Sequence, residues 1–199
     1  MKALGLGVLL MLSLSACSFP PQSHEAAPQT YRLAPVIAPS AAHSASAGKV
    51  LYVPEVAVNP ALDSERITLL KAGLQQDFIA HSRWPDKLSR YLHASLLEAL
   101  SQSGQFQAVS EQLLGKNNAY KLLLHVAHFE VDYADPALQT AAVEVMCEAT
   151  LMRVADQHIV QQQSYRVRRE GVPLSTSRLV EALNSAWSEA LNHLIADVQ

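Results

Sequence analysis

The amino-acid sequence predicts an α/β (α+β) fold, a single domain whose mixed, mostly antiparallel sheet is packed by two main amphipathic helices. Two long segments, 120–133 and 141–155, are rich in strand-forming residues, and the second alternates apolar with mixed side chains. Two others, 84–104 and 176–196, carry apolar residues at helical spacing. Hydrophobic residues make up 49% of the chain and charged residues 17%, which is typical of a globular domain.

Short strands are expected in the first half of the domain. The alternating segment 30–33 and the segment 49–58, which is rich in β-branched and aromatic residues, are typical of strands. Pro54 has no backbone N–H to donate to a sheet, so it should lie at an edge or a bulge. Two further strands are expected at 67–70 and 76–81, joined by a turn.

The two helices carry recognisable start and stop signals. The first should begin at Trp84-Pro85, because Pro loses nothing in the first helical turn, and Gly104 should end it. Its apolar face consists of Leu88, Tyr91, Leu92, Ser95, Leu96 and Ala99. The second helix has a capping candidate in Ser175. Its apolar stripe consists of Val180, Leu183, Trp187, Ala190, Leu191 and Leu194.

The remaining strands complete the sheet. A short strand at 106–110 should precede the two long ones, which the residues at 135–136 (Asp-Pro) separate. After a tight turn at 156–157, the segment 158–168 would return as the next antiparallel strand.

The N-terminus carries the clearest functional motif. A basic residue, Lys2, is followed by an uncharged apolar run at 4–14, which closes with Leu-Ser-Ala and then Cys17. A basic start, an apolar stretch and small residues at the cut form the order of a secretory signal peptide. With a cysteine at the cut, the tetrad resembles a bacterial lipobox. The resemblance implies cleavage before Cys17, with lipid on its thiol and on its new amino group.

The alternatives are an ordinary secretion signal or a membrane-spanning helix, each with an incidental cysteine. The apolar run is too short to span, because crossing a bilayer takes about 20 residues. We therefore expect a signal peptide at 1–16, a lipidated N-terminus and flexible tether at 17–28, and the folded domain at 29–199. Two or more acyl chains anchor a protein stably. In proteobacterial lipoproteins an Asp after the lipidated Cys favours retention in the inner membrane. This chain has Ser18 there, which favours the periplasmic face of the outer membrane if the source is Gram-negative.

Composition and motifs exclude several function classes. The net charge of −3 offers no basic footprint for nucleic acid. With Cys17 committed to lipid, Cys147 has no partner for an intrachain disulfide, and its apolar neighbours favour a buried structural thiol. His125 and His128, three residues apart on a strand, should point to opposite faces and make a poor metal pair. We therefore expect no enzyme activity, no cofactor and no metal.

Two charged groups and one apolar surface leave alternatives open. Asp63, Glu65 and Arg66 suggest an acid pair beside a cation, or more simply a solvated ion pair. The arginines at 166, 168 and 169 suit lipid headgroups, an acidic partner or a solvated strand end. The stripe of the C-terminal helix either packs on the sheet or forms a partner surface.

The order of several short motifs along the chain resembles a known family. The motifs follow the lipobox and tether in this order: Tyr-Arg-Leu (31–33), Val-Pro-x-Val (53–56), Leu-Asp-x-x-Arg-Ile (62–67), Trp-Pro (84–85), Gly-Gln-Phe-x-x-Val (104–109) and Tyr-x-Leu (120–122). Taken together they are similar to the ABC-type transport auxiliary lipoprotein family, the relatives of paraquat-inducible protein C. Many members have Trp-Ala where this chain has Trp84-Pro85, a departure that is compatible with a helix start.

The resemblance implies a role in moving lipid between the inner and outer membranes. Such a lipoprotein would be a non-enzymatic docking subunit for an ABC system whose periplasmic component carries mammalian-cell-entry (MCE) domains. The ring-like partners of such a system suggest that the lipoprotein is a homo-oligomer. The resemblance also implies that Asp63 and Arg66 form a structural ion pair. Two alternatives remain: a lipid-binding shuttle, which needs an apolar cavity, and a structural or assembly lipoprotein of the outer membrane.

Overall fold

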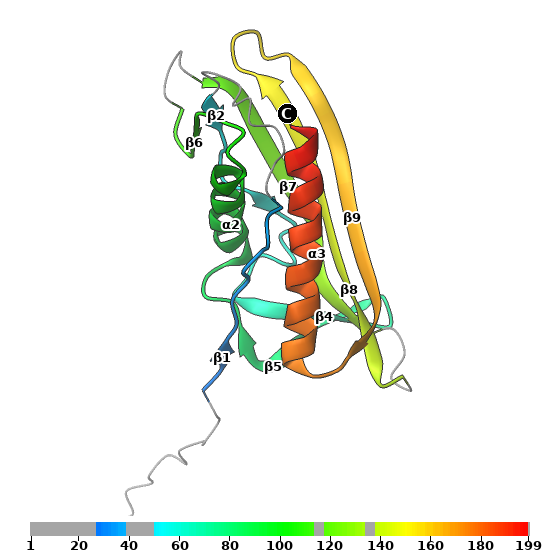
Figure 1. Cartoon of the computed structure of the whole chain (residues 1–199). Helices are drawn as coiled ribbons and strands as arrows, with labels where there is room; N and C mark the ends of the chain where they lie inside the picture. Colours follow the sequence, from blue (N-terminus) through cyan, green and yellow to red (C-terminus); the bar gives the residue numbers. More distant parts are fainter. Residues whose placement is uncertain (1–26, 39–49, 114–117, 134–137, 199) are drawn as a thin grey trace, which may run out of the picture.

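The computed structural model describes residues 27–38, 50–113, 118–133 and 138–198. They form an α+β domain in which a mixed sheet carries two helices, α2 (Leu88–Ser103) and α3 (Thr176–Asp197), on one face (Figure 1). The fold class predicted from the sequence is confirmed.

The sheet is organised around one long strand, β7 (Asn118–Tyr133). Along one edge β7 pairs antiparallel with β8 (Thr140–Arg153), and β8 pairs antiparallel with β9 (Ile159–Pro173). These three strands form the tall curved ribbon of Figure 1. Both long strands predicted from the sequence are confirmed, and the third continues five residues beyond its predicted end.

The other edge of β7 is shared by three short strands that run parallel to it: β2 (Val50–Tyr52), β3 (Ala57–Val58) and β4 (Arg66–Lys71). Three more strands extend this side: β6 (Ala108–Ser110) pairs with β2, β5 (Gln75–Arg83) with β4, and β1 (Gln29–Thr30) with β5. The segment predicted as one strand at 49–58 is therefore two strands separated around Pro54, as a residue without an N–H requires.

Helix α2 begins later than the sequence predicted. Trp84 directly follows β5, and its backbone N–H donates to the Glu65 carbonyl at 2.7 Å. The first helical N–H groups are satisfied by the loop before β4: Leu88 donates to the Ser64 carbonyl and Ser89 to the Asp63 carboxylate at 2.9 Å. The expected start at Trp84-Pro85 was therefore wrong by three residues, because capping came from a distant loop.

The other helix termini follow the sequence signals. Gly104 caps the end of α2 in the left-handed conformation, with φ of 67°. The Ser175 side chain accepts a hydrogen bond from the Arg178 N–H at the start of α3. Both predictions are confirmed.

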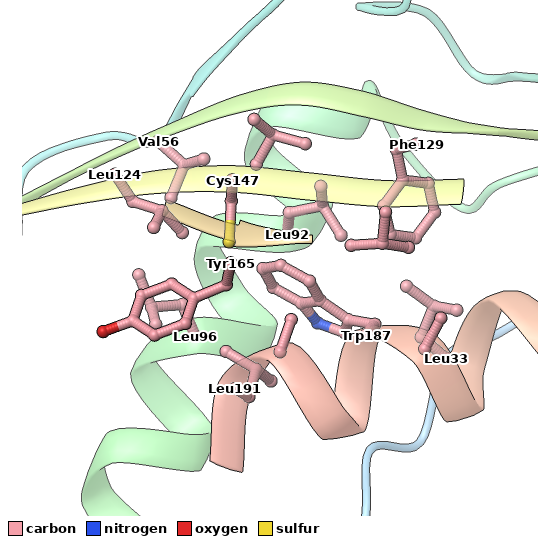
Figure 2. Packing of buried hydrophobic residues seen from close by; sticks show 14 of the residues in the cluster. Leu33, Val56, Leu92, Leu96, Leu124, Phe129, Cys147, Tyr165, Trp187 and Leu191 are labelled. Atoms are coloured by element: carbon pink, nitrogen blue, oxygen red, sulfur yellow. The ribbon is translucent and has the colours of Figure 1, made fainter. Parts of the chain in front are cut away.

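The core lies between the helices and the sheet, and aromatic side chains fill its centre. Trp84, Phe129 and Trp187 are each at most 1% exposed, and Phe129 meets the two indoles edge-on, at centroid distances of 5.9 and 6.0 Å. The Trp187 indole N–H donates to the Ser95 hydroxyl at 3.0 Å, which links α3 to α2. Figure 2 shows Trp187 pointing up from α3 toward Phe129. The stripe of α3 is thus packed on the sheet, as one of the two alternatives predicted.

Candidate functional site at the N-terminal strap

The lipidation motif and the start of the tether lie outside the residues that the structure describes. The first feature after them is an extended segment, residues 31–38, which we call the strap. It continues from β1 and runs across the helical face beside α2 and α3 (Figure 1). The chain that comes from Cys17 first joins the domain at β1, which pairs with β5, and the strap follows directly after it.

Polar side chains of α3 hold the strap by its backbone. Ala34 donates its N–H to the Asn184 side-chain oxygen at 2.7 Å, and the Asn184 amide returns a bond to the Ala34 carbonyl at 3.3 Å. Further along, Val36 donates to the Ser188 hydroxyl at 3.1 Å. The Asn192 amide donates to the Val36 carbonyl at 2.9 Å, and its oxygen accepts from the Ala38 N–H at 2.8 Å.

The match between strap and helix is geometric. An extended chain advances about 6.6–6.8 Å in two residues, and an α-helix advances about 6.0 Å in four. Side chains at 184, 188 and 192 therefore meet the backbone at 34, 36 and 38 in register. Because these contacts use only the backbone of the strap, they fix its path and direction, parallel to α3, without requiring particular strap side chains.

Two contacts fix the lower part of the strap. The Leu33 N–H donates to the Tyr91 hydroxyl of α2 at 2.5 Å, and the Tyr31 N–H donates to the Arg83 carbonyl of β5 at 2.8 Å. The Leu33 side chain is 9% exposed and belongs to the core cluster near Trp187 (Figure 2). The predicted strand at 30–33 is therefore mostly this strap, with only Gln29–Thr30 paired as β1.

Sequence reasoning missed the three α3 residues that bind the strap. Their signal is present, since Asn184, Ser188 and Asn192 recur every four residues beside the apolar stripe. A polar row of this kind is normally a solvated helix face.

We expect the double substitution Asn184→Ala and Asn192→Ala to free the strap while leaving the domain folded. The two asparagines make four hydrogen bonds to the strap. Each stabilises by about 0.5–1.5 kcal/mol net, so the loss of stability should be about 2–6 kcal/mol. Hydrogen exchange of a peptide covering residues 31–38 should accelerate. The control replaces exposed Ser185 and His193 with Ala on the same helix. Unchanged exchange in the double variant would contradict this assignment.

Cys147 is a buried structural thiol, as expected. It is 1% exposed and points from β8 toward the helices (Figure 2). Burial away from water raises the pKa of its thiol to about 12. A thiol with this pKa stays protonated at neutral pH and is a poor nucleophile.

The expected ion pair between Asp63 and Arg66 is not formed, and this prediction was wrong. Asp63 instead caps α2, and the Arg66 guanidinium lies over the Phe78 ring, 3.6 Å from its centroid. The ion pair of this region joins Glu65 and Arg83, at 3.7 Å and half exposed. The role of Asp63 is structural, but it serves the helix rather than the loop.

His125 and His128 lie on the same face of the sheet, contrary to the sequence prediction. The register of β7 shifts at Ala127, so that His125 lies opposite Glu148 and His128 opposite Met146 on β8. An extra residue in one strand reverses the alternation beyond it. His128 contacts Glu130 at 2.6 Å. No group of three or more metal-binding side chains occurs within the described residues.

The arginine cluster of β9 is paired with the protein's own carboxylates. Arg166 and Arg168 contact the buried Glu144 at 2.7 and 2.8 Å, and Arg168 also reaches Asp132 at 2.7 Å. Arg169 instead contacts Glu189 of α3 at 2.7 Å. The arginines therefore stabilise cross-strand and helix–sheet contacts, while the Arg166 side chain stays 62% exposed.

No helix of the described residues has the length and apolar content needed to cross a bilayer. The space between sheet and helices is occupied by buried side chains from both, including Leu96, Leu124, Trp187 and Leu191. Three depressions of the described surface, of about 390 to 700 Å³, are open to solvent and include charged side chains in their lining.

Comparison with known proteins adds a family and a fold. Residues 31–195 match the family model of the ABC-type transport auxiliary lipoprotein component. The match begins at the strap and extends into α3. No curated protein matches the chain.

Two solved structures share the fold over most of their length. A protein from Xanthomonas campestris superposes with a TM-score of 0.73 at 22% identity, covering 84% of this chain and 92% of its own. An uncharacterized protein superposes with a TM-score of 0.68 at 18% identity, covering 87% of this chain and 99% of its own. At these identities the likeness concerns the fold.

Proposed function

The chain belongs to the family of ABC-type transport auxiliary lipoprotein components, and we propose that it is a docking subunit of an MCE-type ABC system. In this proposal Cys17 carries the lipid, the domain stands at the periplasmic face of the outer membrane, and the assembly moves lipid between the two membranes. The single observation that carries the proposal is the family match, which includes the strap and both helices. The role is proposed as non-enzymatic because the family is described as auxiliary.

The strap supports an anchoring role. It follows β1 and is held through backbone contacts that α3 supplies, so the point at which the tether meets the domain is set by the fold. The anchor would therefore be joined to the domain at one fixed place. Lipid movement itself would occur in the partner proteins.

The filled core argues against the alternative of a lipid-binding shuttle. Such a shuttle needs a concave apolar cavity of about 300 Å³ or more. In the described part of the chain, the stripes of α2 and α3 fill the space over the sheet, with Leu92, Leu183 and Trp187 fully buried.

The proposal is tested by recovering partners from solubilised envelopes. A version tagged after Gln199 should enrich an MCE-domain protein, together with the permease of its ABC system. The matched control carries residues 1–28 of this chain fused to an unrelated tagged domain, so that it has the same anchor and tether. Failure to recover the MCE-domain protein under conditions that preserve the complex, or equal recovery by the control, would refute the docking role.

A further inference from the structure

Three exposed leucines come from three different connections of the sheet. Leu74 is 94% exposed in the turn between β4 and β5, where Ala72 and Gly73 adopt left-handed conformations. Leu138 is 55% exposed just before β8, and Leu174 is 37% exposed between β9 and α3. We call these three residues the leucine end.

The strand register places the leucines along one end of the sheet. Lys71, the last residue of β4, lies opposite Tyr133, the last residue of β7. At the same level Thr140, the first residue of β8, lies opposite Pro173, the last residue of β9. The four strands are neighbours in the order β4, β7, β8 and β9. Three spacings of 4.7–4.9 Å put the leucine end on a line of about 14 Å.

The chain enters the domain near this end. Ala27 and Pro28 line a surface depression of about 700 Å³ together with Asp77 of β5. The Asp77 carboxylate is ion-paired with Lys71, which ends β4 beside the turn that holds Leu74. Figure 1 likewise shows β1, where the described chain begins, at the lower end of the molecule, at the level where α3 begins and β9 ends.

The length of the tether keeps this end close to the lipid. A chain of eleven residues, the number from 18 to 28, reaches at most about 40 Å. Strand β7, with 16 residues, is about 50 Å long. The turn between β8 and β9, at the opposite end of the sheet, is therefore farther from the anchor.

Within the described residues, the charged side chains around the leucine end are paired. Lys71 is paired with Asp77, Arg168 reaches Asp132 at 2.7 Å, and the Arg178 guanidinium contacts Glu181 at 2.8 Å. Such a surface offers apolar contacts without an excess of either charge. It matches a zwitterionic lipid surface better than an acidic or basic protein.

We propose that the leucine end rests on the bilayer that holds the lipidated Cys17, with Leu74, Leu138 and Leu174 inserted at the headgroup level. This inference deepens the proposed function and rests on its lipid anchor. The bilayer then orients the domain: β7 stands away from the membrane, and the turn between β8 and β9 faces the periplasmic partner.

The test places one environment-sensitive fluorophore at either end of the lipidated full chain. Leu138→Cys labels the leucine end, and Ile159→Cys, at a position of matched exposure (51%), labels the opposite end. Cys147 stays unlabelled because it is buried and the pKa of its thiol is about 12, and Cys17 is blocked by lipid. The proteins are reconstituted in phosphatidylethanolamine–phosphatidylcholine vesicles containing a lipid with a shallow spin label.

We expect the spin label to quench position 138 at least about twofold more than position 159, because interfacial side chains insert about 5–10 Å. Adding Leu74→Ser and Leu174→Ser should reduce quenching at position 138 to the level at position 159. Equal quenching at the two positions, or quenching at 138 that survives both Ser substitutions, overturns the inference. Protein that fails to float with the vesicles refutes the anchor, and this proposal with it; protein that floats with 138 unquenched refutes only the orientation.

Discussion

Replacing Cys17 with Ala is expected to release the folded domain from the membrane and to abolish function. Cys17 is the proposed site of lipid attachment, and in the same proposal the apolar run before it is cleaved off as part of the signal peptide. Released protein should keep its stability, because the domain is packed through residues after Tyr31 and no core contact of the described residues depends on Cys17. Fractionation of the cell envelope, thermal unfolding and rescue of envelope integrity in a deletion strain measure the three outcomes.

The informative control for Cys17→Ala is Ser18→Asp. By the sorting rule of proteobacterial lipoproteins, this variant should keep its lipid and remain in the inner membrane. It separates loss of the anchor from a change of membrane. If unanchored Cys17→Ala protein still restored envelope integrity, the anchor would have no part in the mechanism.

Replacing Trp187 with Ala should give the largest loss of folding stability of any single core substitution named here. Trp187 is fully buried, packs edge-on against Phe129 of β7 and hydrogen-bonds Ser95 of α2. Removing a buried Trp side chain destabilises a protein by about 3–5 kcal/mol, because transfer energy is lost and a cavity remains. Urea unfolding followed by circular dichroism measures the change.

Two further variants separate packing from hydrogen bonding at this site. Ser95→Ala removes only the acceptor of the indole N–H, and leaving that buried donor unsatisfied should cost about 1–3 kcal/mol. Trp187→Phe keeps most of the aromatic packing and should fall between Ser95→Ala and Trp187→Ala. A loss below about 1 kcal/mol for Trp187→Ala would show that the Trp187 side chain contributes little to folding stability. That result would contradict its packing against Phe129.

Periodicity made the long elements predictable from the sequence. Helix α3 was expected at 176–196 and lies at Thr176–Asp197. The prediction was accurate because the apolar stripe and the Ser175 cap indicate the same helix and the same start. The alternation of β8 was equally clear, since Val143, Val145 and Cys147 face the core. A pattern that extends over many residues still predicts the right element when one residue departs from it.

The errors occurred where a distant segment or a single extra residue determines the structure. The start of α2 depends on Asp63, which is far from it in sequence, and the face of His128 depends on one bulged residue, Ala127. The ion pairs of Glu144 depend on which residues of β9 lie opposite it. None of these can be read from local spacing, because register and capping are properties of the assembled sheet.

The parallel path of strap and α3 determines how the domain responds to force. A pull on the lipid loads the pairing of β1 with β5 first and then the strap, whose hydrogen bonds to Asn184, Ser188 and Asn192 follow one another along α3. The bonds are then loaded in shear, all at once, instead of opening one after another as in a zipper. Tension between the membrane and a docked partner would therefore be shared along α3, and the domain would resist extraction more strongly than the strength of any one of these bonds suggests.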